Sequence, residues 1–142
     1  MMRTTFPIAV VDDDDDDRLM IARAWDSLGY GHELIEFADG DVFLNYMTSD
    51  DGTSTNGRPG LVLPDLNMPR IDGWEVLRRL KASAATRAIP VIVLTTSQRS
   101  SDVGKTYDLG AAAFVAKPAT YTELATTIRH LATFWLDECT VP

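Results

Sequence analysis

Short, unbroken runs of hydrophobic residues recur along the chain. Four are clear and a fifth is weaker: residues 8–11, 61–63, 91–94 and 112–116, and residues 33–37. A strand with one face in solvent alternates hydrophobic and polar residues, whereas a strand covered on both faces does not. The runs therefore predict a parallel sheet with helices on both of its faces.

Segments with a helical spacing of hydrophobic residues separate these runs. They are residues 18–28, 41–47, 74–81, 102–109 and 120–136. Strand and helix thus alternate five times, which predicts an α/β fold with a doubly wound parallel sheet of the (βα)5 type. Such sheets commonly have the strand order 2-1-3-4-5, and the site then lies at the carboxyl ends of strands 1 and 3, where the winding reverses.

The length of 142 residues suits one domain. We expect residues 1–142 to form a single domain, with a core at about 6–136 and a tail at 137–142, and no output domain. The polar loop at residues 48–60 is long for a connection inside such a domain, so it is either functional or simply mobile.

The negative charge of the chain is local rather than general. There are 13 basic and 21 acidic side chains, a net charge of −8, and six of the acids form the run at residues 12–17. Without that run, 13 basic residues face 15 acidic ones. Nucleic-acid binding needs clustered basic residues, and a membrane span needs about 20 consecutive hydrophobic ones, so we expect neither partner. The lone Cys139 cannot form an internal disulfide, which favours a reducing, cytoplasmic setting.

Polar residues follow the predicted strands where the chain leaves the sheet. Asp12 and Asp13 follow the first strand, Asp65 the third and Lys117 the fifth, and Thr95 ends the fourth. Clustered carboxylates repel one another unless a cation neutralises them, and hard oxygen ligands suit Mg²⁺. An aspartate can accept a phosphoryl group, whose charge Mg²⁺, an ammonium and a hydroxyl would stabilise. The strand ends therefore predict a magnesium-dependent phosphoryl-acceptor site.

Four motifs at these strand ends carry a resemblance to a known family. They are VVDDD at residues 10–14, DLNMPRIDG at 65–73, VLTTS at 93–97 and AKP at 116–118. With these four motifs in this order, the chain resembles the receiver domain of response regulators in two-component signalling. That domain has a flavodoxin-like fold. The resemblance covers nearly the whole chain.

The resemblance implies a role for each residue at the site. Asp65 would be the phosphoacceptor, and Thr95 and Lys117 would contact the phosphoryl oxygens. The implied ligands of Mg²⁺ are Asp13 as the main carboxylate, Asp12 partly through water, Asp65, and the backbone carbonyl of Asn67. Phe114 matches an aromatic switch that turns inward when the Thr95 hydroxyl moves onto the phosphate. The family commonly has the Lys117–Pro118 bond in cis, although only about 5% of X–Pro bonds are cis in general.

Within the family, the chain resembles the stand-alone regulators that partner bacterial phytochrome kinases. The features that carry this resemblance are the loop at 48–60, LTTS at 94–97, YDLGA at 107–111 and FWL at 134–136. The implied partner is a sensor histidine kinase of the phytochrome type.

Several polar and aromatic residues have simpler expected roles. Asp14–Asp17 should cap the first helix and complement its dipole, and Asp72 with Gly73 should form a turn and cap. Residues 120–123 (TYTE) form a capping-box pattern, so Thr120 should cap the last helix. Thr96 should bond to the backbone. Trp25 and Trp74 are expected to be packing residues, and neither His32 nor His130 is expected to be catalytic. Phe134 and Trp135 either pack back onto the domain or join a dimer surface.

Pro64 departs from the family pattern, because proline cannot donate a ladder hydrogen bond in a central strand. The strand can survive with a lost bond or a bulge, and the placement of Asp65 is put in question.

The predicted function is a single-domain response regulator that accepts a phosphoryl group on Asp65 from a sensor kinase. Phosphorylation would change the face formed by residues 102–136, which would signal to another protein or through a homodimer. Beyond its own phosphotransfer and dephosphorylation, no enzyme activity is expected. One alternative is a phosphorylation-silent interaction module, which Pro64 favours. The other is a phosphatase with an aspartate nucleophile, against which Asn67 stands where a general-acid carboxylate is needed.

Overall fold

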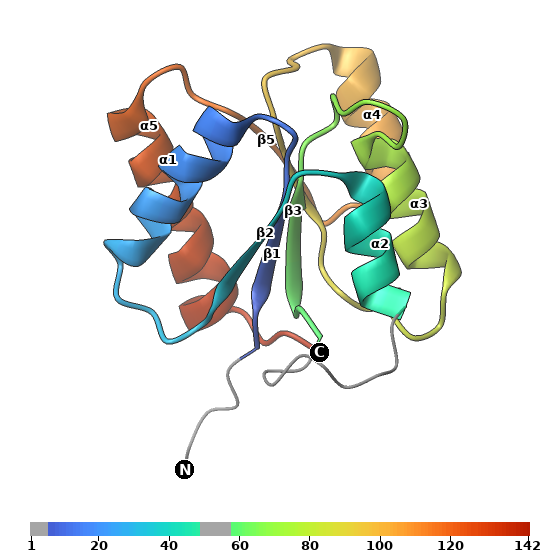
Figure 1. Ribbon diagram of the computed structural model, residues 1–142, viewed down its shortest axis with the longest axis horizontal. Helices are drawn as coiled ribbons and strands as arrows, with labels where there is room; N and C mark the ends of the chain where they lie inside the picture. The colour runs from blue at the N-terminus through green and yellow to red at the C-terminus, as the bar shows by residue number, and fades with distance from the viewer. Residues whose placement is uncertain (1–5, 49–57) are drawn as a thin grey trace.

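The computed structural model describes residues 6–48 and 58–142, and it confirms the alternation of strands and helices (Figure 1). The strands are β1 (Ile8–Val11), β2 (Leu34–Phe37), β3 (Leu61–Pro64), β4 (Ile92–Thr95) and β5 (Ala113–Ala116). The helices are α1 (Asp15–Asp26), α2 (Gly40–Thr48), α3 (Gly73–Ala82), α4 (Ser100–Asp108) and α5 (Tyr121–Ala132), followed by a π-helical segment, η1 (Thr133–Glu138). Most of the predicted loop at 48–60 lies outside the described residues. In the two described ranges, no helix has both the length and the hydrophobicity to cross a membrane.

The strands are parallel, in the order β2-β1-β3 followed by β4-β5. β1 pairs along its whole length with β2 and with β3, and β4 pairs in the same way with β5. Between the fully described strands β3 and β4, the ladder is reduced to one isolated bridge from Val62 to Val91. The strand order agrees with the prediction, but the sheet is interrupted in the middle.

Pro64 explains the interruption. Val62 donates its N–H to the Pro90 carbonyl at 3.1 Å, and the next N–H of β3 on this side would be that of residue 64, because side chains and N–H groups alternate along a strand. Proline has no N–H, so the bridge cannot extend. On the other side, Pro64 stays in register with Val11, whose carbonyl accepts the Asp65 N–H at 2.9 Å. The proline therefore removes a bond toward β4 and preserves the side that places Asp65.

Helices cover both faces of the sheet, with α1 and α5 on one face and α2, α3 and α4 on the other (Figure 1). Alternate residues of β1 enter two separate cores. Ile8 and Val10 pack with residues of α1 and α5, whereas Ala9 and Val11 pack with residues of α2 and α3. All four are at most 1% exposed. Burial of an aliphatic side chain of the size of valine or isoleucine stabilises the fold by roughly 1.5–3 kcal/mol, which explains why β1 lacks polar residues.

Side chains cap the first turn of four helices among the described residues, and Asp39 does so for α2 by accepting from the Val42 N–H at 3.3 Å. Asp14 caps α1, Asp72 caps α3 and Thr120 caps α5, and each accepts a hydrogen bond from the N–H three residues later, at 3.0, 2.9 and 3.2 Å. These are the predicted caps. Because α1 begins so soon after β1, the whole aspartate run stays close to the strand ends.

The segment after α5 packs back onto the domain in part. Leu136 is buried and Trp135 packs on the same core, while Asp137 accepts a hydrogen bond from the Tyr30 hydroxyl at 2.7 Å. Phe134 is 55% exposed and meets the Trp135 ring edge-on, at 5.2 Å between centroids. Packing back onto the domain is therefore confirmed for Trp135, and a dimer surface at Phe134 stays a prediction.

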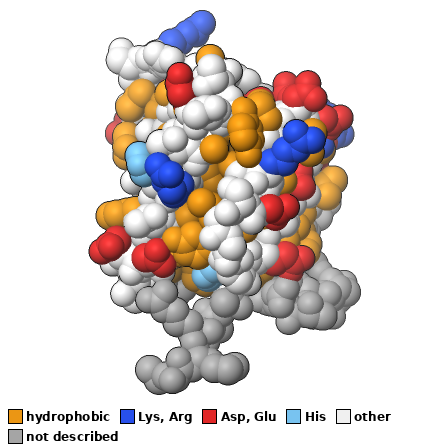
Figure 2. Space-filling model, turned by 90° about the vertical axis from the view of Figure 1, so that its left-hand side faces the viewer, with side chains coloured by type: hydrophobic (Ala, Val, Ile, Leu, Met, Phe, Trp, Pro, Cys, Tyr) orange, Lys and Arg blue, Asp and Glu red, His pale blue; other side chains and the backbone are white. Residues whose placement is uncertain are grey.

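The face formed by α1 and α5 exposes hydrophobic side chains between charged ones (Figure 2). Leu19 of α1 is 49% exposed. Isolated hydrophobic residues at a surface are common, so this exposure alone does not define an interface.

Replacing Pro64 with valine would supply the missing N–H. The new hydrogen bond should contribute about 1 kcal/mol, but the loss of proline's restriction on the unfolded chain costs about 0.4–1 kcal/mol, so the free energy of unfolding should change little. Hydrogen exchange is the better measurement: in Pro64→Val we expect slow exchange of the amide at position 64. Fast exchange there would mean that the gap between β3 and β4 has another cause.

Candidate functional site

Backbone pairing that continues past the strand ends positions the predicted site residues. The N–H groups of Asp12, Asp65 and Lys117 each bond to a carbonyl of the neighbouring strand, at 2.9, 2.9 and 2.7 Å. The sheet itself, rather than a flexible loop, therefore sets the starting point of these three side chains. Such rigid support is what a site with defined geometry needs.

The Lys117 ammonium lies at the centre of the site. Its Nζ donates to one oxygen of each of three carboxylates, at 2.5 Å from Asp12, 2.8 Å from Asp17 and 2.9 Å from Asp65. The Lys117 side chain is 5% exposed, and those of Asp12, Asp65 and Asp17 are 2%, 10% and 28% exposed. Removal of one partner from a buried ion cluster is costly, because it leaves the opposite charge without compensation.

Burial and the contacts within the cluster shift the pKa of the Lys117 ammonium and that of the Asp12 carboxyl. Burial by itself would lower the pKa of the Lys117 ammonium, but the hydrogen bonds to Asp12, Asp17 and Asp65 raise that pKa well above its usual value. Burial raises the pKa of the Asp12 carboxyl, with a smaller contribution from the charge of Asp65, against the lowering effect of its bonds to Lys117 and the Asp14 N–H. Lys117 is therefore charged at neutral pH, and the carboxylates around it exceed the cations.

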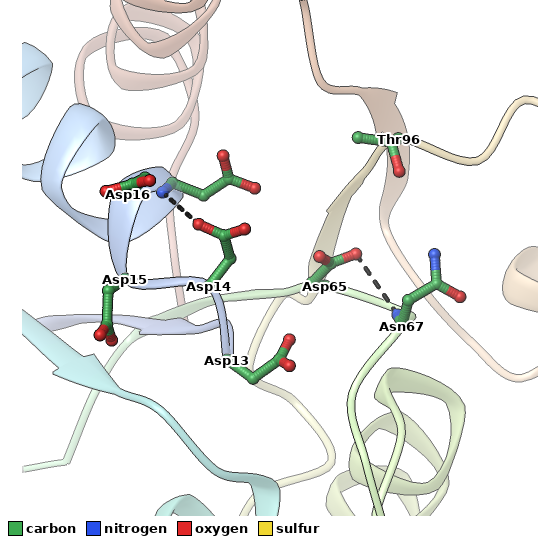
Figure 3. A pocket seen from close by; sticks show the side chains of 8 residues that line it. Asp13, Asp14, Asp15, Asp16, Asp65, Asn67 and Thr96 are labelled. Carbon is green, nitrogen blue, oxygen red and sulfur yellow. Dashed lines mark hydrogen bonds between the residues drawn. The ribbon is translucent and has the colours of Figure 1, made fainter.

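An open pocket of about 560 Å³ adjoins this cluster (Figure 3). Its lining residues are Asp13, Asp14, Asp15, Asp16, Asp17, Asp65, Asn67 and Thr96. Asp65 lies between Asp13 and Asn67, and its Oδ1 accepts the Asn67 N–H at 3.4 Å, while its Oδ2 accepts from Lys117. Lys117 is not among the described lining residues. One Asp65 oxygen thus faces the pocket and the other is held by a buried cation.

Acidic side chains at this edge of the sheet offer oxygen ligands for a divalent cation, and three of them also surround the Lys117 ammonium. Asp12, Asp17 and Asp65 each place a carboxylate oxygen within 4.8 Å of the others. Carboxylate oxygens gathered in this way are typical ligands of hard divalent ions. Asp13, the predicted main ligand, is exposed and lines the pocket, where an ion would enter from solvent. Asp12 is buried, and its two oxygens accept from Lys117 and from the Asp14 N–H.

The expectation that Asp14–Asp17 only cap α1 and meet solvent holds for Asp14 but not for Asp17, whose carboxylate bonds to Lys117. Asp17 comes three residues after the cap, and helical side chains point back toward the N-terminus of the helix. This places its carboxylate over the strand ends. The sequence shows only that Asp17 lies three residues after the Asp14 cap. Its contact with Lys117 can be recognised only when the fold places Lys117 beside it.

Thr95, the last residue of β4, and Thr96, which follows it, each differ from their expected surroundings. Thr95 is fully buried, and its Oγ1 accepts the Ser97 N–H at 3.4 Å, whereas Thr96, which we expected to bond to the backbone, lines the pocket. Phe114 is half-buried on β5, and its N–H donates to the Tyr107 hydroxyl at 3.2 Å, which ties α4 to the edge strand. A contact between Thr95 and a phosphoryl group stays a prediction.

The peptide bond between Lys117 and Pro118 is trans, so the cis form implied by the resemblance is wrong for this structure. The trans form is the one that the great majority of X–Pro bonds adopt.

The residues expected to be structural are packed as predicted. The Trp25 Nε1 donates to the His32 carbonyl and the Trp74 Nε1 to the Thr106 hydroxyl, both at 3.0 Å. The His32 Nδ1 lies 2.9 Å from the Phe6 carbonyl, away from the strand ends that carry the site. The two tryptophans therefore satisfy their polar atoms within the fold.

Comparison with known proteins agrees with this fold and site. The family model described as response regulator receiver domain matches residues 8–129. The chain is 35% identical to the probable methanogenesis regulatory protein FilR2 of Methanothrix harundinacea, over 92% of this chain and 84% of that protein. It is 32% identical to the response regulator Rcp1 of Synechocystis, over 95% of this chain and 92% of that protein.

Two solved structures are similar over almost their full length. That of the phosphorylated cyanobacterial phytochrome response regulator RcpA gives a TM-score of 0.90 at 32% identity, covering 97% of this chain and 99% of that one. The Mn²⁺-bound form of Rcp1 gives 0.87 at 31% identity, covering 96% and 99%. The fold and the acidic strand ends are those of a two-component signalling protein. The chain belongs to the response regulator receiver domain family.

Gly73, the first residue of α3, lies against the backbone of Asp65. A Cβ at this position would be 2.2 Å from the Asp65 carbonyl oxygen and 2.9 Å from the Leu66 Cα. We therefore expect Gly73→Ala to displace Asp65 and to lower the free energy of unfolding by about 1–3 kcal/mol, as overpacking does.

Gly104→Ala is the matched control, because nothing lies within 4 Å of a Cβ added there in α4. It should raise the stability by up to about 1 kcal/mol, since alanine favours a helix. Urea unfolding measures both variants. Equal stabilities would contradict the proposed close approach at Asp65.

Proposed function

We propose that this protein accepts a phosphoryl group on Asp65 from the phosphohistidine of a sensor histidine kinase. The observation that carries the proposal is the arrangement of Asp65 itself. Its Oδ1 borders an open pocket, and its Oδ2 is held by the buried Lys117 ammonium at 2.9 Å. A carboxylate can act as the nucleophile toward phosphorus, and a nearby cation stabilises the charge of the transferring group.

Mg²⁺ is the proposed cofactor. The residues that would hold it are Asp13, Asp65 and the Asn67 carbonyl at the pocket, with Asp12 behind them. This set offers hard oxygen donors and an open side where water and a phosphoryl group can complete the coordination, as Mg²⁺ prefers. When bound, the ion would neutralise charge on the phosphoryl oxygens. The name of the similar Rcp1 structure records Mn²⁺, another divalent ion.

The proposed response to phosphorylation runs through Thr95 and Phe114. The Thr95 hydroxyl would leave its backbone contact and bond to the phosphoryl group, and the half-buried Phe114 ring would turn into the space beside it. Because Phe114 donates its N–H to Tyr107 of α4, a change at β5 would reach α4. This is a shift in population between two conformations, driven by a local change of charge.

The proposed partner is a phytochrome-type histidine kinase in the cytoplasm. The relatives that support this are RcpA, named as a phytochrome response regulator, and Rcp1. We further propose that residues 1–142 act as one receiver domain, whose signal passes to another protein or to a second copy of the chain. Direct binding to nucleic acid or membrane is not part of this proposal.

Two other functions are alternatives that the acetyl phosphate experiment below would distinguish. A phosphorylation-silent interaction module was favoured by Pro64, but the proline preserves the backbone bond that places Asp65. A phosphatase would need a general-acid carboxylate near Asp65, and Asn67 occupies the place two residues on.

Acetyl phosphate tests the proposal directly. With Mg²⁺ present, we expect the intact mass to rise by one phosphoryl group in the wild type and not in Asp65→Asn, because the amide is a poor nucleophile. Chelation of the metal should slow the gain strongly. No gain in the wild type would indicate the silent module, and steady turnover of an unrelated phosphomonoester would indicate a phosphatase.

Dimerisation is the proposed output, through a surface that includes Phe134. We expect beryllofluoride with Mg²⁺, which mimics an aspartyl phosphate, to raise the sedimentation coefficient of the wild type but not of Phe134→Ser, since exposed aromatics favour interfaces. Leu19→Ser is the control, because Leu19 is similarly exposed on α1 (49% against 55%). A dimer lost in the Leu19 variant and kept in the Phe134 variant would place the surface on the α1 side instead.

A further inference from the structure

Lys117 has no free hydrogen-bond donor in this structure. An ammonium has three N–H groups, and the three carboxylates of Asp12, Asp17 and Asp65 accept from it at 2.5, 2.8 and 2.9 Å. Its side chain is 5% exposed and does not line the pocket. A phosphoryl group that enters the pocket can therefore be reached by Lys117 only after one of these three bonds breaks.

Asp17 is the partner that Lys117 can leave most easily. Asp12 is 2% exposed, and its other oxygen is held by the Asp14 N–H, so it would be left buried with an uncompensated charge. Asp65 is the acceptor itself. The Asp17 side chain is 28% exposed at the start of α1, where solvent and the helix N-terminus can compensate its charge.

Asp17 also adds negative charge where a phosphoryl group would arrive. Its carboxylate lines the pocket, and one of its oxygens lies within 4.8 Å of an Asp65 oxygen. A fixed negative charge at this distance repels an incoming anion, and a partly buried site screens that repulsion less than bulk water does. The bond to Lys117 and the repulsion would both slow the transfer of a phosphoryl group to Asp65.

We propose that Asp17 is a positioning residue that slows phosphoryl transfer to Asp65, because its carboxylate holds one Lys117 donor away from the pocket. This inference rests on the proposed function of Asp65. In the reaction with acetyl phosphate, a lone pair of Asp65 Oδ1 forms the new bond to phosphorus. The bond between phosphorus and the acetate oxygen breaks, and acetate leaves with the electron pair. Lys117 moves one N–H from Asp17 to a phosphoryl oxygen, and no proton is transferred.

The test compares Asp17→Asn with Asp16→Asn. Both substitutions remove one negative charge from the same run and keep the size of the side chain, but Asp16 takes no part in the Lys117 cluster. With acetyl phosphate and saturating Mg²⁺, we expect Asp17→Asn to be phosphorylated about tenfold faster than the wild type and Asp16→Asn at most about twofold faster. Asp17→Glu, which keeps the charge, should stay close to the wild type.

A double-mutant cycle with Lys117→Ala separates a positioning role from a general effect of charge. We expect Asp17→Asn to give at most the roughly twofold acceleration of a general charge effect in the Lys117→Ala background, because the bond that it releases is already absent. An acceleration of about tenfold that survives there, an equal effect of Asp16→Asn, or a slower Asp17→Asn would each overturn the inference. Circular dichroism melting of each variant shows that the fold is kept.

The wild type distinguishes a failure of the proposed function of Asp65 from a failure of the inference about Asp17. A wild type that takes up no phosphate removes the proposed function and this inference with it. A wild type that is phosphorylated, beside an Asp17→Asn variant that is not accelerated, removes the inference alone.

Discussion

The hydrogen bonds from Lys117 to three aspartates join parts of the chain that are far apart in the sequence. Asp12 follows β1, Asp17 lies in the first turn of α1, Asp65 follows β3 and Lys117 follows β5. The cluster is buried, so its charges are costly to separate. It therefore fixes the relative position of four segments at the same edge where a phosphoryl group would arrive.

This constraint matters more because the sheet is interrupted. Pro64 reduces the ladder between β3 and β4 to one bridge, so the β4-β5 pair is held to the rest of the sheet with fewer backbone bonds. Lys117 belongs to the β5 side, and two of its partners, Asp12 and Asp65, belong to the β1-β3 side. The proposed phosphorylation of Asp65 would change the charge at this connection, and it would therefore have a physical route to β5 and α4.

Much of this arrangement could be predicted from the sequence, because buried strands and helix caps leave local signals. The hydrophobic runs placed the five strands to within about a residue, and Asp14, Asp72 and Thr120 marked three helix starts. The bond between Asp17 and Lys117 could not be predicted in this way, because it joins residues 100 positions apart. Which of Thr95 and Thr96 faces the pocket depends on the pleat at the last residue of β4, which composition does not determine.

The six aspartates can be tolerated side by side because the fold distributes them among several environments. The carboxylates of Asp14 and of the first turn of α1 complement the helix dipole. Asp12 and Asp17 share the Lys117 ammonium. Arg18, immediately after the run, donates to the Asp12 carbonyl at 2.5 Å and pairs with Asp15. Asp13 stays exposed at the pocket next to Asp65. The negative charge that the fold leaves uncompensated is therefore concentrated beside Asp65, the proposed phosphoacceptor, where a divalent cation would be most useful.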